Sequence, residues 1–168
     1  MKQKIILLIL FAAGFMASRA NENPAVQYSF EARFGNSIAV TWNKIQEVYV
    51  GCFSLKNEHV HAYFYEDGEF LGTGKYIAVA EIAARKKTAI DSKFNGWLIE
   101  EAYEFTPIDS APELFVMIRN LKFTAVIRIN ERGSIQILQR TRNKSNSDSK
   151  NSSGISRGNV NMVSEPMF

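Results

Sequence analysis

The sequence contains few of the residues that usually build catalytic and metal sites. Its 168 residues include one cysteine, Cys52, and two histidines, His59 and His61. A lone cysteine cannot form a disulfide within the chain, so we expect Cys52 to be a buried apolar residue and core packing to stabilise the fold. No phosphate loop, nucleophile elbow or paired-cysteine metal motif is present. These absences predict a protein that is not an enzyme and that holds no cofactor.

An apolar run long enough to span a membrane is also missing, but residues 1–20 have the pattern of a signal peptide. Lys2 and Lys4 precede an apolar run over residues 5–16, and Ser18-Arg19-Ala20 offers small residues to a signal peptidase. The run is shorter than the ~20 residues that a spanning helix needs. We therefore expect cleavage after Ala20, a periplasmic or secreted protein, and no stable membrane insertion of the mature chain.

The mature chain has no excess charge of one sign. The formal charge of +3 comes from twenty basic and seventeen acidic residues, and three of the basic ones, Lys2, Lys4 and Arg19, lie in the predicted signal peptide. Their removal leaves a neutral protein, which argues against nucleic acid as a partner. The basic run over residues 85–87 is typical of a solvated helix face.

Hydrophobic spacing divides the ordered part of the chain into two helices and a series of strands. In the first helix Val26, Phe30 and Phe34 recur at four-residue spacing between a capping Asn23 and a terminating Gly35. Alternating and apolar segments elsewhere predict strands. The expected elements after the first helix are an extended segment from Ile38, strands over 48–55, 59–65, 69–73, 97–105, 114–119, 122–130 and 134–139, and a second helix over 79–94.

Several details of this pattern are specific enough to be tested. The Asp67-Gly68 pair predicts a two-residue hairpin loop. Residues 72–76 are interpreted as a linker between two halves of the chain. In the second helix we expect one face to be apolar, formed by Ile82, Ala83, Ala89, Ile90 and Phe94.

The two halves of the chain have the same order of elements, a helix followed by a tryptophan and antiparallel strands. Two such small units cannot each bury much surface alone. We therefore predict an α+β fold in which the two units form one antiparallel sheet with both helices packed on one face. The expected domain spans residues 21–140, with units over 24–75 and 76–140. A disordered tail rich in serine and asparagine is expected over 141–168.

The best candidate for a binding site is one face of the strand over residues 59–65. Alternation places His59, His61, Tyr63 and Tyr65 on the same side of this strand, and the opposite side, with Val60, Ala62 and Phe64, should face a helix. We predict that the first side contacts a protein or peptide in the cell envelope; the hairpin tips are a second possible contact. The alternative is a metal site on the two histidines, but a stable site needs at least one or two further ligands.

Two other clusters fit structural roles better than chemical ones. Glu100 and Glu104 should lie on one face of their strand, and Glu101 on the other, with no histidine or lysine partner at an informative spacing. We interpret them as solvated strand residues. Five aromatic residues have two interpretations, an exposed binding patch or packing in the core, and packing is favoured for each of them. They are Trp42, Tyr49, Tyr63, Tyr65 and Trp97.

The order of elements and several short motifs resemble those of the exported PepSY-like proteins of Bacteroidetes, whose fold is similar to that of beta-lactamase inhibitor protein. The matching features span residues 25–138. They are the helix ending at Phe34, Trp42-Asn43-Lys44, the strand with Tyr49 and Phe53, the segment AYFYEDGEFL over 62–71, the second helix ending at Phe94, and INERGSIQIL over 129–138.

Some positions depart from the usual pattern of that family. Gly35 stands where a proline often follows the phenylalanine, Val79-Ala80 where a Leu-Pro pair often opens the helix, and residues 131–133 replace the second Asp-Gly. The resemblance implies tandem helix-on-sheet units and a periplasmic or extracellular location. It implies little chemistry, because a fold shared with an inhibitor is not evidence of inhibition.

Overall fold

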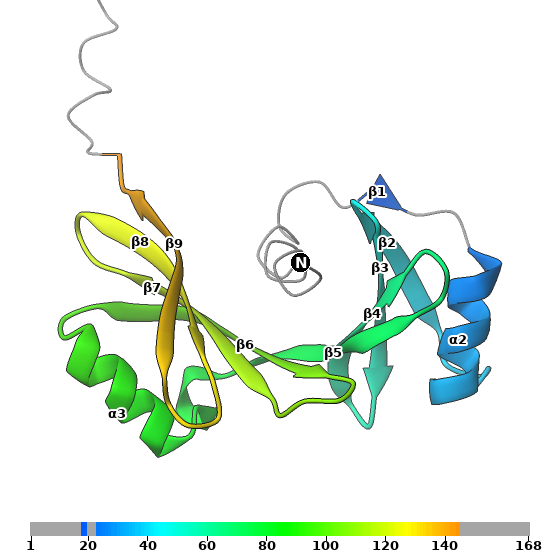
Figure 1. Ribbon diagram of the computed structural model, residues 1–168, viewed down its shortest axis with the longest axis horizontal. Helices are drawn as coiled ribbons and strands as arrows, with labels where there is room; N and C mark the ends of the chain where they lie inside the picture. The colour runs from blue at the N-terminus through cyan, green and yellow to red at the C-terminus, as the bar shows by residue number, and fades with distance from the viewer. Residues whose placement is uncertain (1–17, 20–22, 145–168) are drawn as a thin grey trace, which may run out of the picture.

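The structure is a computed structural model that describes residues 18–19 and 23–144. Its strands follow one another as an antiparallel meander in the order of the sequence (Figure 1). The strands are β1 (Ser18–Arg19), β2 (Val40–Ile45), β3 (Val48–Leu55), β4 (Glu58–Tyr65), β5 (Phe70–Ile77), β6 (Leu98–Pro107), β7 (Glu113–Arg119), β8 (Phe123–Ile129) and β9 (Ile135–Arg142). The helical segments are α2 (Pro24–Phe34), the 3-10 turn η1 (Val79–Glu81) and α3 (Ala84–Lys93).

Helix α2 begins and ends where the sequence predicts. The Asn23 side chain accepts hydrogen bonds from the backbone N–H groups of Ala25 and Val26, and Gly35 ends the helix with a positive φ of 96°. Val26 and Phe30 are buried against the predicted face of β4, where they meet a cluster of aromatic and small residues. That cluster contains Trp42, Tyr49, Phe53, Val60, Ala62 and Phe64.

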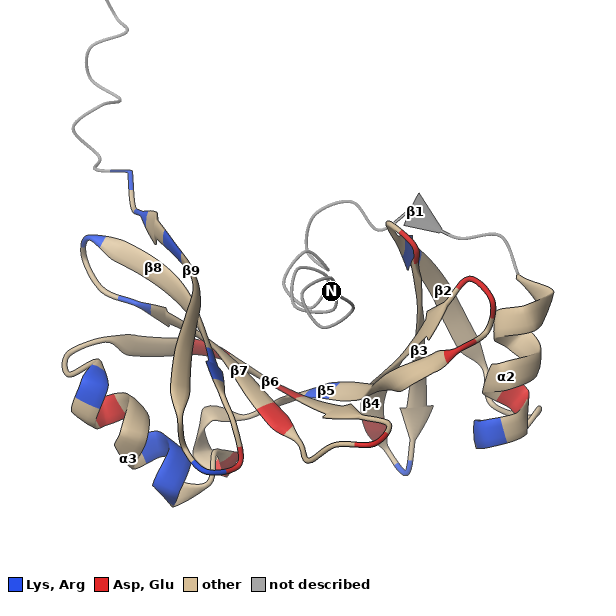
Figure 2. Cartoon of the chain, viewed as in Figure 1, with Lys and Arg blue, Asp and Glu red and all other residues tan. Residues whose placement is uncertain are grey.

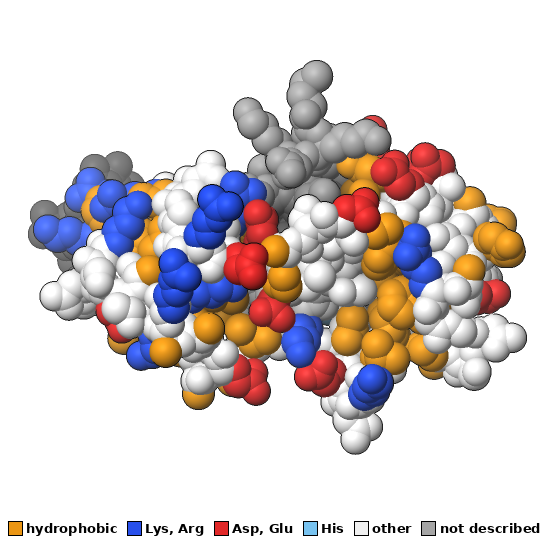
Figure 3. All heavy atoms as spheres, turned by 60° about the horizontal axis from the view of Figure 1, so that its bottom comes forward, with side chains coloured by type: hydrophobic (Ala, Val, Ile, Leu, Met, Phe, Trp, Pro, Cys, Tyr) orange, Lys and Arg blue, Asp and Glu red, His pale blue; other side chains and the backbone are white. Residues whose placement is uncertain are grey.

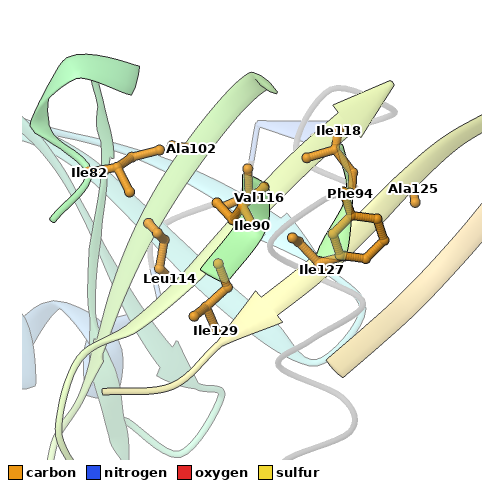
Figure 4. Close-up of a cluster of buried hydrophobic side chains, with 10 residues drawn as sticks. All are labelled: Ile82, Ile90, Phe94, Ala102, Leu114, Val116, Ile118, Ala125, Ile127 and Ile129. Atoms are coloured by element: carbon orange, nitrogen blue, oxygen red, sulfur yellow. The ribbon is translucent and has the colours of Figure 1, made fainter. Parts of the chain in front are cut away.

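Helix α3 packs on the second half of the sheet in the same way. Ile90 and Phe94 contact alternate residues of β6, β7 and β8 in a second apolar cluster (Figure 4). The sheet residues of this cluster are Ala102, Leu114, Val116, Ile118, Ala125, Ile127 and Ile129.

Both helices lie on one face of a single sheet, which confirms the predicted fold class. Ala62, which faces α2, pairs with Thr73 in β5, and the same side of β5 continues to Ile77, which pairs with Ala102 under α3. Opposite residues of an antiparallel pair share a face, so α2 and α3 pack on the same side. The other side of the strongly curved sheet carries no described helix (Figure 1).

The predicted linker over residues 72–76 is wrong, because these residues belong to β5 at the middle of the sheet. Gly72 and Gly74 suggested a flexible connection, yet both pair with β6, opposite Pro107 and Phe105. Large side chains of β6 lie over both glycines and leave no room for a side chain there.

The second helix is shorter than predicted. Residues 79–81 form a 3-10 turn whose Glu81 side chain accepts a hydrogen bond from the Ala78 backbone N–H at 2.9 Å. Ile82 and Ala83 are then extended before α3 starts. The break buries Ile82 in the α3 cluster but leaves Ala83 exposed, so the predicted apolar face is only partly correct.

The turn at Asp67-Gly68 is present but longer than the predicted two-residue loop. The Tyr65 backbone N–H donates to the Glu69 carbonyl at 2.8 Å, and the Gly68 N–H donates to the Tyr65 carbonyl at 2.9 Å. Only Gly68 has a positive φ, 87°. A three-residue loop with one left-handed glycine therefore joins β4 to β5.

The sheet continues slightly past the predicted end of the domain. β9 runs to Arg142, and the Asn143 N–H donates to the Lys122 carbonyl at 2.9 Å. The predicted boundary between the two units falls inside β5. The predicted signal peptide, apart from Ser18 and Arg19, and the tail from residue 145 onward lie outside the described residues.

Candidate functional site

The candidate site lies on the side of the sheet opposite α2 and α3, which we call the aromatic face. The strand pairings place two of the four predicted residues there beside β5: His61 lies opposite Gly74 and Tyr63 opposite Gly72. Tyr65 packs at the edge of the buried cluster on this face, and His59 is exposed at its margin. The cluster consists of Val48, Val50, Tyr63, Leu71, Tyr103, Phe105 and Phe115.

A chain of hydrogen bonds crosses the middle of the aromatic face. The Tyr63 and Tyr103 hydroxyl oxygens are 2.7 Å apart, and the Tyr103 oxygen lies 2.9 Å from Nδ1 of His61. The tautomer of His61 decides which way the two hydrogen bonds run, and with either neutral tautomer all three groups are paired. The ring of Tyr76 packs edge-on against both His61 and Tyr103, with centroids 6.0 and 4.8 Å away.

Two glycines of β5 make this arrangement possible. A Cβ atom on Gly74 would lie 2.4 Å from the Tyr103 hydroxyl oxygen, and one on Gly72 would lie 2.9 Å from the Phe105 ring. The side chains of β6 therefore lie across the bare backbone of β5. This close approach is what allows Tyr103 to reach His61 and Tyr63 on β4.

Burial keeps the groups of this network uncharged at neutral pH. It strongly raises the pKa of Tyr103, and the adjacent Tyr63 adds to that effect. Burial also raises the pKa of Tyr63, although its hydrogen bond with Tyr103 lowers it. Burial lowers the pKa of His61, and the charge of nearby His59 lowers it further. The network offers neutral donors and acceptors for recognition and has no group poised to gain or lose a proton near pH 7.

The depressed pKa of His61 predicts a pH dependence of stability. The unfolded chain takes up a proton at His61 near pH 6.5, whereas the folded chain takes it up only at lower pH. The unfolded state then binds more protons, so the free energy of unfolding should fall as the pH drops below about 6.5 and should level off below the folded pKa. Urea unfolding between pH 7.5 and 5 measures this slope.

A glutamine pair of variants separates the two histidines. His61→Gln should remove most of the slope and keep a hydrogen bond to Tyr103, whereas His59→Gln should retain most of it. An unchanged slope in His61→Gln would show that the proton linkage arises elsewhere.

The two histidines and Cys52 come near one another but do not converge on a point. His59, His61 and Cys52 line an open hollow of about 570 Å³ with residues of the loop before β2. Burial raises the pKa of the half-buried Cys52 thiol, and the Asn43 amide at 3.5 Å lowers it less. In the part of the chain that the structure describes, no three His, Cys, Asp or Glu side chains are grouped to hold a metal ion.

Glu101 and Glu104 lie on opposite faces of β6 as the alternation predicts, but a bulge breaks the alternation at Glu100. A bulge lies between Ile99 and Glu101, and the Glu100 carboxylate pairs with Arg119 of β7 at 2.5 Å. Glu101 shares the face of Tyr103, and Glu104 lies opposite Lys75. They do not form a pair of facing carboxylates.

The predicted aromatic patch is divided between the two sides of the sheet. Trp42 and Tyr49 pack under α2, and Trp97 packs against Phe94 beside α3, whereas Tyr63 and Tyr65 lie on the aromatic face. Packing thus accounts for the two tryptophans. The sequence did not predict the central residues Tyr76 and Tyr103 as part of the site. A strand over 72–76 would have placed Gly72, Gly74 and Tyr76 on one face.

Comparison with known proteins identifies the fold. No protein-family profile and no curated protein sequence matches the chain. Among solved structures, a Bacteroides eggerthii protein provisionally assigned to the periplasm superposes with a TM-score of 0.61 at 14% identity, covering 73% of this chain and 90% of its own. A DUF2874 family protein of Bacteroides ovatus gives 0.62 at 13% identity, with 73% and 89% covered.

A third solved structure superposes on the chain in the same way. A BLIP-like protein of Bacteroides fragilis superposes with a TM-score of 0.60 at 16% identity, covering 76% of this chain and 92% of that protein. Within the described residues, no helix is both long and apolar enough to cross a membrane.

The three superpositions together show that the chain has the BLIP-like fold of these Bacteroides proteins.

Proposed function

We propose that the chain is an exported, non-enzymatic binding protein that contacts a protein or peptide of the cell envelope through its aromatic face. The observation that carries the proposal is the group formed by His61, Tyr63, Tyr76 and Tyr103 on a sheet face that no described helix covers. Aromatic side chains with polar ends are common anchors at protein interfaces. Tyr76 is 51% exposed at the centre of this group.

Export and family membership are part of the same proposal. The signal-like residues 1–20 support export, and the fold shared with a Bacteroides protein provisionally assigned to the periplasm agrees with it. We also propose that the chain is PepSY-like, on the motifs over residues 25–138. Cleavage after Ala20 would remove Ser18 and Arg19, which pair with Lys44 and Asn43 respectively, and would leave β2 at the edge of the sheet.

A photo-crosslinking experiment tests the binding proposal. A benzophenone amino acid replaces Tyr76 in the chain expressed in its native host, and the control carries it at Tyr28, which is 78% exposed on α2. After irradiation, the envelope fraction is analysed by mass spectrometry. We expect an adduct with a defined protein from position 76 and not from position 28, on a chain whose mass corresponds to residues 21–168.

A binding variant strengthens the test. Tyr76→Ala should reduce recovery of the crosslinked partner by at least tenfold when the probe is placed at Tyr65, while Tyr28→Ala should not. Identical adducts from positions 76 and 28, or none from either, would contradict binding through the aromatic face.

Inhibition of an enzyme is a narrower form of this proposal. The BLIP-like neighbour supports it only through the fold. A panel of beta-lactamases and proteases assayed with the purified chain would decide it, and a panel without inhibition would reject this form alone.

A further inference from the structure

A corner of the sheet formed by β6, β7, β8 and β9 carries two exposed leucines. Leu121, at the tip of the turn between β7 and β8, is 99% exposed, and Leu98, at the start of β6, is 66% exposed. Both line one open hollow of about 660 Å³ with Arg119 and Lys144. A single exposed leucine is ordinary, but two that share a hollow with basic side chains form a surface of mixed character.

The turn that carries Leu121 is held in one conformation. The Asn120 side chain accepts hydrogen bonds from the backbone N–H groups of Lys122 at 2.9 Å and Phe123 at 2.8 Å. The Asn143 side chain donates to the Asn120 carbonyl at 2.8 Å and accepts from the Thr124 hydroxyl at 2.8 Å. Leu121 is thus fixed in its outward position, and binding there requires no ordering of the turn.

Basic side chains flank this corner on both faces of the sheet: Lys144 lines the hollow with Leu98, whereas Arg142 shares the opposite face with Phe123. Arg142 lies opposite Phe123 in the pairing of β8 with β9. The backbone N–H of the next residue, Asn143, donates to the Lys122 carbonyl, so the end of β9 lies beside Lys122. Arg119 is paired with Glu100, whereas Lys122, Arg142 and Lys144 form no ion pair with another described residue. Lysine and arginine gather at this end of the β8 and β9 strands (Figure 2) and over the α3 half of the molecule (Figure 3).

We propose that this corner, comprising Leu98, Leu121, Lys122, Arg142 and Lys144, binds the surface of an anionic phospholipid bilayer. The leucines would enter the headgroup boundary while the three cations contact lipid phosphates. A projecting apolar tip with basic neighbours matches the chemistry of such a surface, which is apolar beneath a negatively charged layer. This contact is peripheral and goes beyond the proposed binding through the aromatic face.

The charge pattern favours a bilayer over a general attraction to anions. Helix α3 carries its own basic run, Arg85, Lys86 and Lys87, but no exposed large apolar residue accompanies it. If the negative charge of the partner alone determined binding, α3 would bind it as well as the corner does. The leucines distinguish the two surfaces, so the test compares them directly.

Vesicle sedimentation with the exported form, residues 21–168, tests the proposal. The vesicles are phosphatidylcholine alone or a mixture with phosphatidylglycerol at low salt. We expect binding only to the mixed vesicles. Leu121→Asn should weaken binding about tenfold or more, since a buried leucine contributes at least that much. The double variant Lys122→Gln/Arg142→Gln should weaken it about 25-fold, at about fivefold for each charge.

The matched control removes the same charge from α3. Lys86→Gln/Lys87→Gln should bind within about twofold of the unchanged chain, and circular dichroism should show all variants folded. Failure to bind mixed vesicles would overturn the proposal and point to an acidic protein as the occupant. An equal loss in the α3 control, or no loss in Leu121→Asn, would overturn it as well, because each would reduce the contact to general charge attraction.

Discussion

Substitution of Gly72 with alanine is expected to lower the free energy of unfolding by about 2–5 kcal/mol. Gly72 has a φ of 148°, which side-chain-bearing residues rarely adopt, and an added Cβ would lie 2.4 Å from the backbone oxygen of Thr106. The oxygen belongs to the adjacent strand, so β5 and β6 would have to separate at the centre of the sheet. A small domain has a total stability of only about 5–15 kcal/mol, so this loss would be a large fraction of it.

Gly96→Ala is the control for the backbone part of this effect. Gly96 also has a positive φ, 77°, but no atom lies within 4 Å of the position of its Cβ. Its replacement should cost about 1–2 kcal/mol, the conformational penalty alone. Urea unfolding followed by tryptophan fluorescence compares the two variants. If Gly72→Ala is no less stable than Gly96→Ala, the close approach of β6 to Gly72 is not a constraint on the fold.

The first half of the fold follows closely from local sequence signals. Asn23 and Gly35 mark the ends of α2, and the stripe of Val26, Phe30 and Phe34 fixes the side that packs on the sheet. The alternation of β4 correctly separates the residues that face α2 from those on the aromatic face. In these segments each signal concerns residues that are near one another in the sequence, so local patterns are sufficient.

The middle of the sheet could not be predicted in this way. Glycine weakens the local preference for a strand, and only the rings of Tyr103 and Phe105, about thirty positions later, explain why glycines are needed in β5. The hydrogen bonds that Tyr103 forms with His61 and Tyr63 likewise join residues 42 and 40 positions apart. The sequence therefore predicts the part of the candidate site on β4. The part that involves Tyr103 cannot be predicted until β6 is placed beside β5.

The break before α3 has a similar origin. Residues 79–94 have a helical apolar period, yet Ile82 is buried from an extended conformation between η1 and α3. The capping interaction between Glu81 and the Ala78 N–H stabilises the short turn by itself. Periodicity reports which residues are apolar, and the packing of Ile82 against the sheet decides whether the helix continues.

Substitution of Phe30 with alanine is the other change expected to have a large effect, a loss of about 3–5 kcal/mol in the free energy of unfolding. Phe30 is 1% exposed, and its ring centroid lies 5.0 Å from that of Phe53 and 5.4 Å from that of Trp42. It is the largest fully buried side chain of α2, so its removal leaves a cavity where the helix meets the sheet. Urea unfolding should show the loss, and Trp42 fluorescence should report the altered contact.

The same helix supplies the matched control. Tyr28 is 78% exposed on α2, so Tyr28→Ala removes an aromatic ring of nearly equal size and should change stability by no more than about 0.5 kcal/mol. Equal losses in the two variants would indicate that α2 is not anchored through Phe30. Because β3 and β4 carry the α2 cluster on one side and part of the aromatic face on the other, a loosened α2 should also weaken binding through Tyr76, whereas Tyr28→Ala should leave it intact. Measuring stability and crosslinking in the same pair of variants thus tests whether the packed side of the sheet holds the binding side in shape.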